Sequence, residues 1–460
     1  MRFLLPLLFL SLPPCLAQTP ATAPARPPQL EKPATVEAAP PLTLQEATQL
    51  ALNQNFGIRL ARQDEQLATN NFTRGNAGQL PSLTGNATRT FNRNNINQRF
   101  GDSDPRVVNG GTSNLLNSNV TLGWTIFDGF AMFIAYDQLR TLRQQQQAIS
   151  RATVEETVED VSNAYFAVVR EAGKIRSLEE ALAIGQARVD LTQARVDVGV
   201  AAKVEVLTAR VDYNADRSLL LQQQELLRTA KIQLNALLGR APGTDFSPAD
   251  SIVVARNLAR EPLQAQLTAA NPRLQQARLG VAVATYDRRL ARANRYPSLG
   301  VVAGYGLNRN INNAAFAGTA LTNSSNRTLG LNYGLTASLP IFDGFNLRRL
   351  EQNARVAEES SQLQLQQTTL QLDADLEQAY QRYQNRLRLL ELEEDNIRLA
   401  RQNVQIALER YRLGLLTPLA LHEAQRSQLD AAVRLLDIRY QAKEAETALR
   451  RLSGSLVQAQ

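Results

Sequence analysis

The sequence predicts an α+β membrane protein that is internally duplicated, with very long α-helices joined to four β-strands. Three observations lead to this prediction. The pentapeptide IFDGF occurs at 126–130 and again at 341–345. The stretch 345–413 contains neither glycine nor proline, which indicates one long helix rather than ordinary globular helices of about 12 residues. The residues before each IFDGF alternate between apolar and small or polar types, as half-exposed strands do.

The N-terminal residues are predicted to be an export signal and a linker. Residues 1–17 combine an early arginine, an apolar run and a small-residue cleavage site, so we predict a secretory signal peptide. Residues 18–41 are rich in Pro and Ala and are predicted to form a disordered tether. The single cysteine, Cys15, would leave with the signal, which excludes disulfides. A lipid anchor on Cys15 is the disfavoured alternative, because Pro14 stands where a small residue is expected.

The rest of the chain reads as two copies of one structural unit. We predict a first repeat at 42–240, a connector at 241–260 and a second repeat at 261–454. An offset of 215 or 216 residues relates the two repeats throughout, which indicates duplication rather than chance. The matched positions include three pairs: Pro81 and Pro297, Gly199 and Gly414, and Gly239 and Gly454.

Each repeat is predicted to contain, in order, a helix, a strand pair, a very long helix, a tip turn and a return helix. The strand pairs are expected at about 82–127 and 297–341. Gly199 and Gly414 are expected to end the long helices, because glycine is favoured just past a helix C-terminus. Pro418 suits the first turn of the second return helix.

The strands are predicted to turn an apolar face to lipid. A strand with one apolar and one small or polar face also fits the cover of a soluble core, but the export signal and the long helices favour a membrane. No apolar run beyond the signal reaches the ~20 residues of a spanning helix, so any crossing must use strands. The aromatic residues Trp124, Tyr305 and Tyr333 are expected at the membrane interfaces.

Four strands are too few to close a membrane barrel, which needs at least about eight. An open strand edge in lipid would leave backbone groups without hydrogen bonds. The chain is therefore predicted to be a homo-oligomer whose copies share one barrel, with the long helices packed side by side into a second tube.

The repeated IFDGF is predicted to join strand to helix once in each repeat. Phe127 and Phe342 would anchor at the membrane boundary. Asp128 and Asp343 would cap the helix N-terminus, and Gly129 and Gly344 would relax the backbone there. The alternative is that each Asp-Gly pair forms a hairpin turn.

Composition excludes several other functions. The chain has 50 Lys and Arg against 43 Asp and Glu, but no basic stripe with interleaved aromatics, so we predict no nucleic-acid partner. No catalytic constellation, cofactor motif or metal-ligand spacing is present, so we predict no enzyme, no cofactor and no metal. The sole histidine, His422, could form a ring only between copies around a threefold axis. A plain packed or exposed histidine is the favoured interpretation.

These features together resemble the TolC family of bacterial outer-membrane efflux proteins. The resemblance covers about 42–455 and is carried by LPIFDGF, EVLTAR, ALLG and ANPRLQQAR in the family's order and spacing. It implies that three chains form a twelve-stranded barrel in the outer membrane, continuous with a periplasmic helical barrel. It also implies docking to a periplasmic adaptor and an inner-membrane pump, and the export of drugs, other small molecules or secreted proteins.

The resemblance also implies a gate at the periplasmic tip, where the helix pairs turn. Tyr411 matches a tyrosine that hydrogen-bonds to an acid, and Glu205 matches that acid. Arg188 falls on a polar family position, and Glu423 on an acidic constriction. Two departures weaken the match: Ala420 replaces a second acid, and Leu416 replaces an arginine.

Two other classes of protein remain as alternatives. A periplasmic adaptor would have one helical hairpin rather than two. An exported coiled-coil structural protein would not need four half-polar strands.

Overall fold

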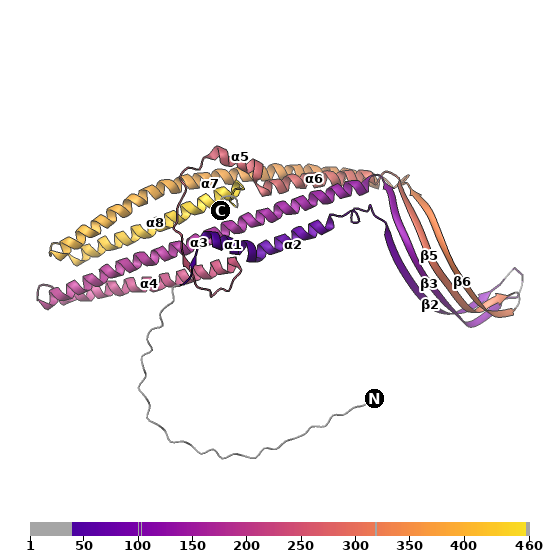
Figure 1. Ribbon diagram of the computed structural model, residues 1–460, viewed down its shortest axis with the longest axis horizontal. Helices are drawn as coiled ribbons and strands as arrows, with labels where there is room; N and C mark the ends of the chain where they lie inside the picture. Colours follow the sequence, from indigo (N-terminus) through magenta and orange to yellow (C-terminus); the bar gives the residue numbers. More distant parts are fainter. Residues whose placement is uncertain (1–38, 100, 103, 318–319, 457–460) are drawn as a thin grey trace, which may run out of the picture. The chain divides into compact units, whose positions relative to one another are not determined.

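The structure, a computed structural model, describes residues 39–460 except 100, 103, 318–319 and 457–460 (Figure 1). The predicted signal peptide and the tether up to residue 38 lie outside the described residues. The first repeat and the connector contain β1 (Pro41–Leu42), α1 (Leu44–Gln54), α2 (Phe56–Asn71), β2 (Ser82–Gln98), β3 (Arg106–Asp128), α3 (Ala131–Asp197), α4 (Lys203–Leu238) and β4 (Ser247–Pro248). The second repeat contains α5 (Arg260–Ala270), α6 (Pro272–Ala293), β5 (Ser298–Ala317), β6 (Ala320–Ser338), α7 (Asn346–Arg412) and α8 (Pro418–Leu452).

Each repeat begins with two helices, whereas one was predicted. The break lies at Asn55 in the first repeat and at Asn271 in the second. Both asparagines have extended backbone and accept a hydrogen bond from the amide three residues on, so each starts a new helix. Each also donates its side-chain amide to the end of the return helix, to the carbonyl of Leu237 or Leu452. The asparagine at the break therefore connects the first helices of each repeat to the end of its return helix.

The very long helices predicted from the sequence are present. Helices α3 and α7 each have 67 residues, or about 100 Å at 1.5 Å per residue. Each runs antiparallel to its return helix, α3 beside α4 and α7 beside α8 (Figure 1). No helix in the described part of the chain is both long enough and apolar enough to cross a membrane.

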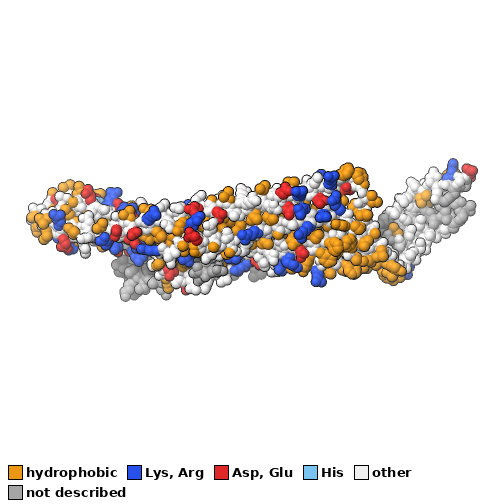
Figure 2. Space-filling view, turned by 90° about the horizontal axis from the view of Figure 1, so that it is seen from above, with side chains coloured by type: hydrophobic (Ala, Val, Ile, Leu, Met, Phe, Trp, Pro, Cys, Tyr) orange, Lys and Arg blue, Asp and Glu red, His pale blue; other side chains and the backbone are white. Residues whose placement is uncertain are grey.

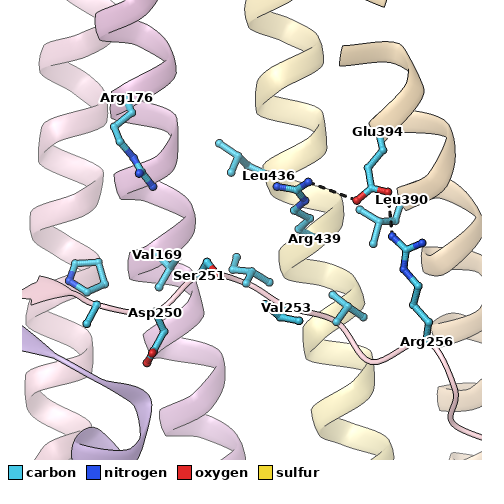
Figure 3. A pocket seen from close by; sticks show the side chains of 14 residues that line it. Val169, Arg176, Asp250, Ser251, Val253, Arg256, Leu390, Glu394, Leu436 and Arg439 are labelled. Carbon is cyan, nitrogen blue, oxygen red and sulfur yellow. Dashed lines mark hydrogen bonds and ion pairs between the residues drawn. The ribbon is translucent and has the colours of Figure 1, made fainter. Parts of the chain in front are cut away.

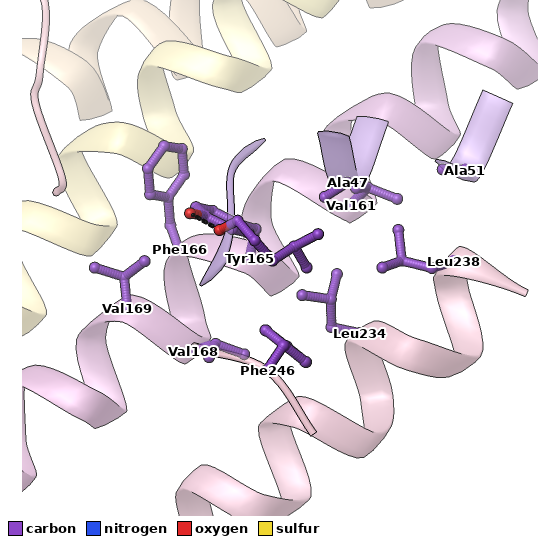
Figure 4. Close-up of a cluster of buried hydrophobic side chains, with 11 residues drawn as sticks. Ala47, Ala51, Val161, Tyr165, Phe166, Val168, Val169, Leu234, Leu238 and Phe246 are labelled. Carbon is purple, nitrogen blue, oxygen red and sulfur yellow. Dashed lines mark hydrogen bonds between the residues drawn. The ribbon is translucent and has the colours of Figure 1, made fainter. Parts of the chain in front are cut away.

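The main hydrophobic cores lie where the short helices and the connector cover the long ones. In the first repeat, Tyr165 of α3 is fully buried beside Leu234, Leu238 and Phe246 (Figure 4). Its hydroxyl donates to the Leu42 carbonyl at 2.9 Å or to the Asp250 carboxylate at 3.0 Å. Burial raises the pKa of Tyr165 to about 12, so the phenol keeps its proton and remains a donor.

The connector closes over this core. Strand β4 pairs with β1 in parallel, and the Ala249 amide donates to the Leu42 carbonyl at 3.0 Å. In the second repeat, Tyr383 of α7 plays a matching part and donates to the Ala255 carbonyl at 2.5 Å. One buried tyrosine on each long helix thus holds the backbone that crosses it.

The four long strands form one antiparallel sheet in the order β2-β3-β5-β6 (Figure 1). Strand β3 starts at Arg106 and includes the glycine- and asparagine-rich residues 109–114 that follow it. No residue of this sheet belongs to a buried hydrophobic cluster in the described chain. The sheet therefore does not cover a core within its own chain, which disfavours the soluble interpretation of its apolar face.

The strand register gives the sheet two different faces. Directly paired residues share a face, and three successive rows on one face join apolar residues from β3, β5 and β6. The opposite face carries small or polar residues such as Thr121, Gly304 and Asn332. On β6 the three apolar rows run from Leu331 to Leu335, which spans about 13 Å at ~3.3 Å per residue. These rows are Val120–Tyr305–Leu331, Leu122–Ala303–Tyr333 and Trp124–Val301–Leu335.

The two IFDGF segments form the strand-to-helix junctions, and the aspartates act as predicted. The Asp128 carboxylate accepts from the Met132 amide at 2.9 Å, and Asp343 accepts from Leu347 at 2.6 Å. Gly129 and Gly344 have φ of 68° and 67°, a left-handed backbone that glycine adopts freely. The hairpin-turn alternative is wrong, because a 67-residue helix follows each Asp-Gly pair.

The last phenylalanine of each motif has a strained backbone that the sequence did not predict. Phe130 and Phe345 are the only non-glycine residues of the described chain with positive φ, at 68° and 65°. Such a backbone costs a bulky residue of the order of 1–3 kcal/mol. Each ring packs edge to face on the first phenylalanine of its motif, Phe127 or Phe342, at 5.2 and 5.5 Å between centroids. The aromatic pair offsets part of the backbone strain.

Removing the second cap should destabilise the start of α7. Asp343→Ala deletes the acceptor for the Leu347 amide and should cost about 1 kcal/mol, seen as a lower melting temperature of the helical circular dichroism signal. The matched variant Asp343→Asn keeps an acceptor oxygen and should lose clearly less. Equal losses for the two variants would show that the cap does not act through this hydrogen bond.

Candidate functional site

The ends of the two helical hairpins farthest from the sheet form the candidate site. Gly199 follows α3 and Gly414 follows α7, with φ of 79° and 76°. In both turns the next residue donates its amide back to a carbonyl of the last helical turn, from Val200 to Arg195 and from Leu415 to Arg410, each at 2.9 Å. This is the usual glycine-ended helix stop. The glycines predicted to form the tip turns therefore do so.

Tyr411 joins the two hairpins, but not to the predicted partner. Its side chain on α7 is fully buried, and its hydroxyl lies 2.6 Å from the hydroxyl of Thr192 on α3. Thr192 also donates to the Arg188 carbonyl at 2.7 Å, so the tyrosine can donate to the threonine. The predicted Tyr411–Glu205 hydrogen bond is wrong. Glu205 lies in the first turn of α4, beyond the tip turn, while α3 itself covers the tyrosine.

Two more contacts surround this tyrosine. The Arg195 guanidinium of α3 lies 5.6 Å from the ring centroid of Tyr411, within cation–π range. Val404, Leu421 and Ala424 complete a small buried cluster at the tip. The sequence carried a signal for Thr192, because it lies between Val189 and Val196 on the apolar stripe of the long helix. A threonine in such a stripe needs a partner inside the protein.

Arg188 lies at the same end of the molecule and is almost fully buried, with 2% of its side chain exposed. Its guanidinium donates to the Asp212 carboxylate of α4 at 2.8 Å. The same carboxylate oxygen lies 3.9 Å from Nδ1 of His422 on α8. These three residues therefore connect α3, α4 and α8. Sequence reasoning named Arg188 but missed Asp212.

Glu423 is solvent-exposed in the single chain, as an acid facing a lumen or the outside would be. Leu416, where the family resemblance implies an arginine, packs against the buried tip cluster. Ala420 lies in the first turn of α8, where its amide donates to the Thr417 hydroxyl at 3.3 Å. The substitutions noted in the sequence thus place apolar packing and helix capping where charge was expected.

Both tip turns expose large apolar side chains. Figure 2 shows hydrophobic side chains gathered at the end of the hairpins away from the sheet. Isolated exposed apolar residues are ordinary, but a cluster at one end indicates a binding surface. We call this set the tip apolar surface: Val198, Val200, Val204, Leu413, Leu415 and Leu419, each exposed by more than 60%.

The predicted interface aromatics lie on the apolar face of the sheet. Trp124, Tyr305 and Tyr333 belong to three neighbouring rows of that face, and all three are exposed in the single chain. The Trp124 indole donates to the Gln79 carbonyl at 3.2 Å, so its polar edge faces the junction with the helices. This combination of apolar body and satisfied polar edge suits a membrane interface.

A separate hollow lies between α3, α7, α8 and the connector (Figure 3). Its volume is about 530 Å³. Arg256 and Arg439 both pair with Glu394, at 3.0 and 3.4 Å, and Arg176 lies across the hollow from Arg439. None of the predicted site residues lines it. The described residues also contain no group of three or more metal-ligating side chains that could hold a metal ion.

Comparison with known proteins identifies the architecture. The sequence model of the outer membrane efflux protein family matches residues 47–240 and 263–455, which correspond to the two repeats. The toluene efflux pump outer membrane protein TtgC of Pseudomonas putida is 25% identical over 425 residues, 89% of this chain and 82% of TtgC. Protein CyaE of Bordetella pertussis is 24% identical over 264 residues, which cover 57% of this chain and about half (54%) of CyaE.

A solved structure gives the same result for the fold. The outer membrane protein VceC from Vibrio cholerae superimposes with a TM-score of 0.71 at 20% identity, covering 89% of this chain and 96% of VceC.

The Tyr411–Thr192 contact should hold the two hairpin ends together. Tyr411→Phe removes a buried hydrogen bond worth about 1 kcal/mol, so backbone amides near 188–196 and 404–411 should exchange with deuterium roughly fivefold faster. Glu205→Gln is the comparison variant and should leave exchange there unchanged. Faster exchange in Glu205→Gln than in Tyr411→Phe would restore the original pairing.

Proposed function

This chain belongs to the outer membrane efflux protein family, and on that premise we propose that three copies assemble into one exit duct across the outer membrane. The sheet with two unpaired edges is the observation that carries the proposal. Strands β2 and β6 each pair on one side only within the described chain. In lipid an unpaired edge is too costly to persist, so each edge must meet another copy. Two copies would supply eight strands and three would supply twelve; three is the number that the family resemblance implies.

The internal duplication predicts how β6 of one copy meets β2 of the next. Within the chain, β3 pairs with β5 and places Leu122 opposite Ala303. The same relation between repeats, shifted by 215 residues for β3 and 216 for β5, places Ala337 opposite Ala87 of the neighbouring copy. Both alanines lie on the apolar face of the sheet. The same face of the sheet then continues across the boundary between copies.

The long helices have the same need for a neighbour. Large apolar side chains on the outer faces of α4 and α7 are exposed in the single chain, among them Leu221, Leu363 and Leu370. Helices with such faces are stabilised when neighbouring helices cover them. Placed side by side, the hairpins of three copies form a tube that continues the barrel into the periplasm. The chain is then a passive conduit, and its energy comes from elsewhere.

The hairpin ends form the gate of this conduit. Tyr411 and Arg188 hold neighbouring helices together there through Thr192 and Asp212. Glu423, exposed in the single chain, faces the lumen near the constriction, and Glu205 lies at the mouth on the first turn of α4. Opening requires α7 and α8 to move away from α3 and α4, which separates the Tyr411–Thr192 pair.

We assign small organic molecules as the cargo class. The toluene efflux pump outer membrane protein TtgC aligns over most of both chains. Export of a small molecule by a passive duct requires a periplasmic adaptor and an inner-membrane pump. The tip apolar surface gives the adaptor its docking site. Outer-membrane lipid covers the apolar face of the sheet, which carries Trp124, Tyr305 and Tyr333.

The shared barrel can be tested by disulfide crosslinking. Ala87→Cys combined with Ala337→Cys should crosslink neighbouring copies under mild oxidation, because directly paired residues have Cβ atoms about 4.5–5.5 Å apart. Paired positions in an antiparallel sheet alternate between hydrogen-bonded and non-hydrogen-bonded pairs. The adjacent pair, Thr88→Cys with Thr336→Cys, therefore tests the kind of position that the first pair does not. At least one of the two pairs should give dimer and trimer bands on a denaturing gel. The native cysteine, Cys15, lies in the predicted signal peptide and does not compete.

The register control uses Thr90→Cys with Ala337→Cys. It shifts one thiol by three positions and onto the opposite face of the sheet, so no crosslink should form. Crosslinks in this control but in neither matched pair would contradict the proposed register. A ladder that stops at the dimer would contradict three copies.

Charging the tip apolar surface should block export without breaking the channel. Val200→Asp with Leu415→Asp places carboxylates where an adaptor would bury apolar side chains worth about 1.5–3 kcal/mol each. Cells carrying this variant should become as sensitive to toluene as cells that lack the protein, while the crosslinked trimer still forms. Val200→Ile with Leu415→Met keeps the surface apolar and should retain resistance. Full resistance in the aspartate variant would place adaptor docking elsewhere.

A further inference from the structure

The sole histidine of the chain lies in a charged cavity between the two hairpins, near the proposed gate. This cavity of about 360 Å³ is lined by Ala181 of α3, by four residues of α4, and by five residues of α8. His422 is half-buried, and its Nδ1 lies 3.9 Å from the carboxylate of Asp212. The imidazole thus reaches from the second hairpin to an acid of the first.

The charges around this imidazole are unbalanced when it is neutral. Helix α4 contributes Asp212 and Asp216, and α8 contributes Arg426 and Asp430. Arg188 of α3 reaches the same group through its ion pair with Asp212. Among the described residues that line the cavity, none comes from α7. Three carboxylates therefore face two guanidiniums, and a protonated His422 makes the cavity neutral.

Two buried hydrogen-bond donors in this region also lack partners in the described structure. Nε of Arg188 and Nε2 of Gln425 are buried and have no hydrogen-bond partner in the described structure. Both side chains are at least nine-tenths buried. With these donors unpaired, the carboxylates rely on the surrounding positive charges for compensation. One more positive charge at His422 would have a larger effect here than on a solvated surface.

We propose that His422 and Asp212 form a pH-sensitive latch between α8 and α4, which fastens the gate when the periplasm becomes acidic. This inference rests on the proposed function, because it assigns a regulation to the gate. An imidazole gains its proton between about pH 8 and pH 5. The protonated form attracts Asp212 and Asp216 and holds the second hairpin against the first.

Asp216 acts in the same direction. Burial raises the pKa of its carboxyl, while the charges of His422 and Arg188 oppose that rise. A carboxyl whose pKa is raised in the packed state stabilises that state at low pH and loses this effect as the pH increases. Acidification therefore favours the closed packing in two ways. It charges His422, and protonation of Asp216 removes the free-energy cost of burying its negative charge.

The latch is present once per chain, because the duplication did not copy it. The offset of 215 places Leu207 at the position of His422 and Ser427 at the position of Asp212. The equivalent contact between neighbouring copies therefore has no titratable pair. Only the contact between the two hairpins of one chain responds to pH.

Conductance in planar bilayers at about pH 7.5 and about pH 5.5 tests the latch, since histidine titrates between these values. The wild-type assembly should conduct about fivefold less at the lower pH, the size expected for a partly exposed ion pair. His422→Gln should lose most of this response. His422→Arg carries a fixed charge and should conduct poorly at both. Asp395→Asn removes an exposed acid that does not line the cavity and should keep the wild-type response.

The contrary outcomes are distinct. A wild-type conductance that does not change with pH, or an acid response that persists in full in His422→Gln, overturns the latch. Loss of the response in Asp216→Asn with full retention in His422→Gln assigns the titration to the aspartate and also overturns it. A wild-type protein that conducts at neither pH overturns the exit duct itself, which separates failure of the proposed function from failure of the latch.

Discussion

The unpaired edges of β2 and β6 impose the constraint on which the rest of the structure depends. A four-stranded sheet with an apolar face and a polar face cannot be stable alone in lipid, because both edges expose backbone amides and carbonyls. In the proposed assembly, pairing with further copies satisfies the edges, and the same pairing brings the exposed faces of the long helices together. In this assembly the barrel thus requires no core inside the single chain, whereas the long helices keep the buried clusters around Tyr165 and Tyr383.

The two repeats differ where their neighbours differ. A side chain at Gly129 would lie 2.6 Å from the Ala293 carbonyl and from Tyr296, because α6 of the second repeat packs on this junction. The equivalent Gly344 has open space around it, and Ile341 beside it is 93% exposed. The first junction is thus completed within the chain. By the symmetry of the duplication, the second junction is completed by α2 of the next copy in the proposed trimer.

Local features of this fold were predictable from sequence, and features that depend on facing helices were not. The long helices, the glycine stops at Gly199 and Gly414, and the caps at Asp128 and Asp343 all follow from interactions within a few residues. The left-handed backbone of Phe130 was not predicted, because residue propensities disfavour it for phenylalanine. A ring contact with Phe127, which propensities do not include, offsets the strain. The family resemblance assigned Glu205 as the partner of Tyr411. The observed partner is Thr192, and this contact depends on the rotation of α7 against α3, which sequence spacing alone does not determine.

The contacts at the tip have the size that a switchable gate requires. Moving α7 away from α3 breaks both the Tyr411–Thr192 hydrogen bond and the Arg195–Tyr411 cation–π contact. Each is worth about 1 kcal/mol, so three copies together lose about 6 kcal/mol. Converting a population from 1:99 to 99:1 takes about 5.5 kcal/mol. A partner that buries two or three side chains of the tip apolar surface only in the open state can supply this difference, since each contributes about 1.5–3 kcal/mol. The free energy gained when a partner buries the exposed tip side chains is therefore similar to the free energy lost when the few buried polar contacts behind them break.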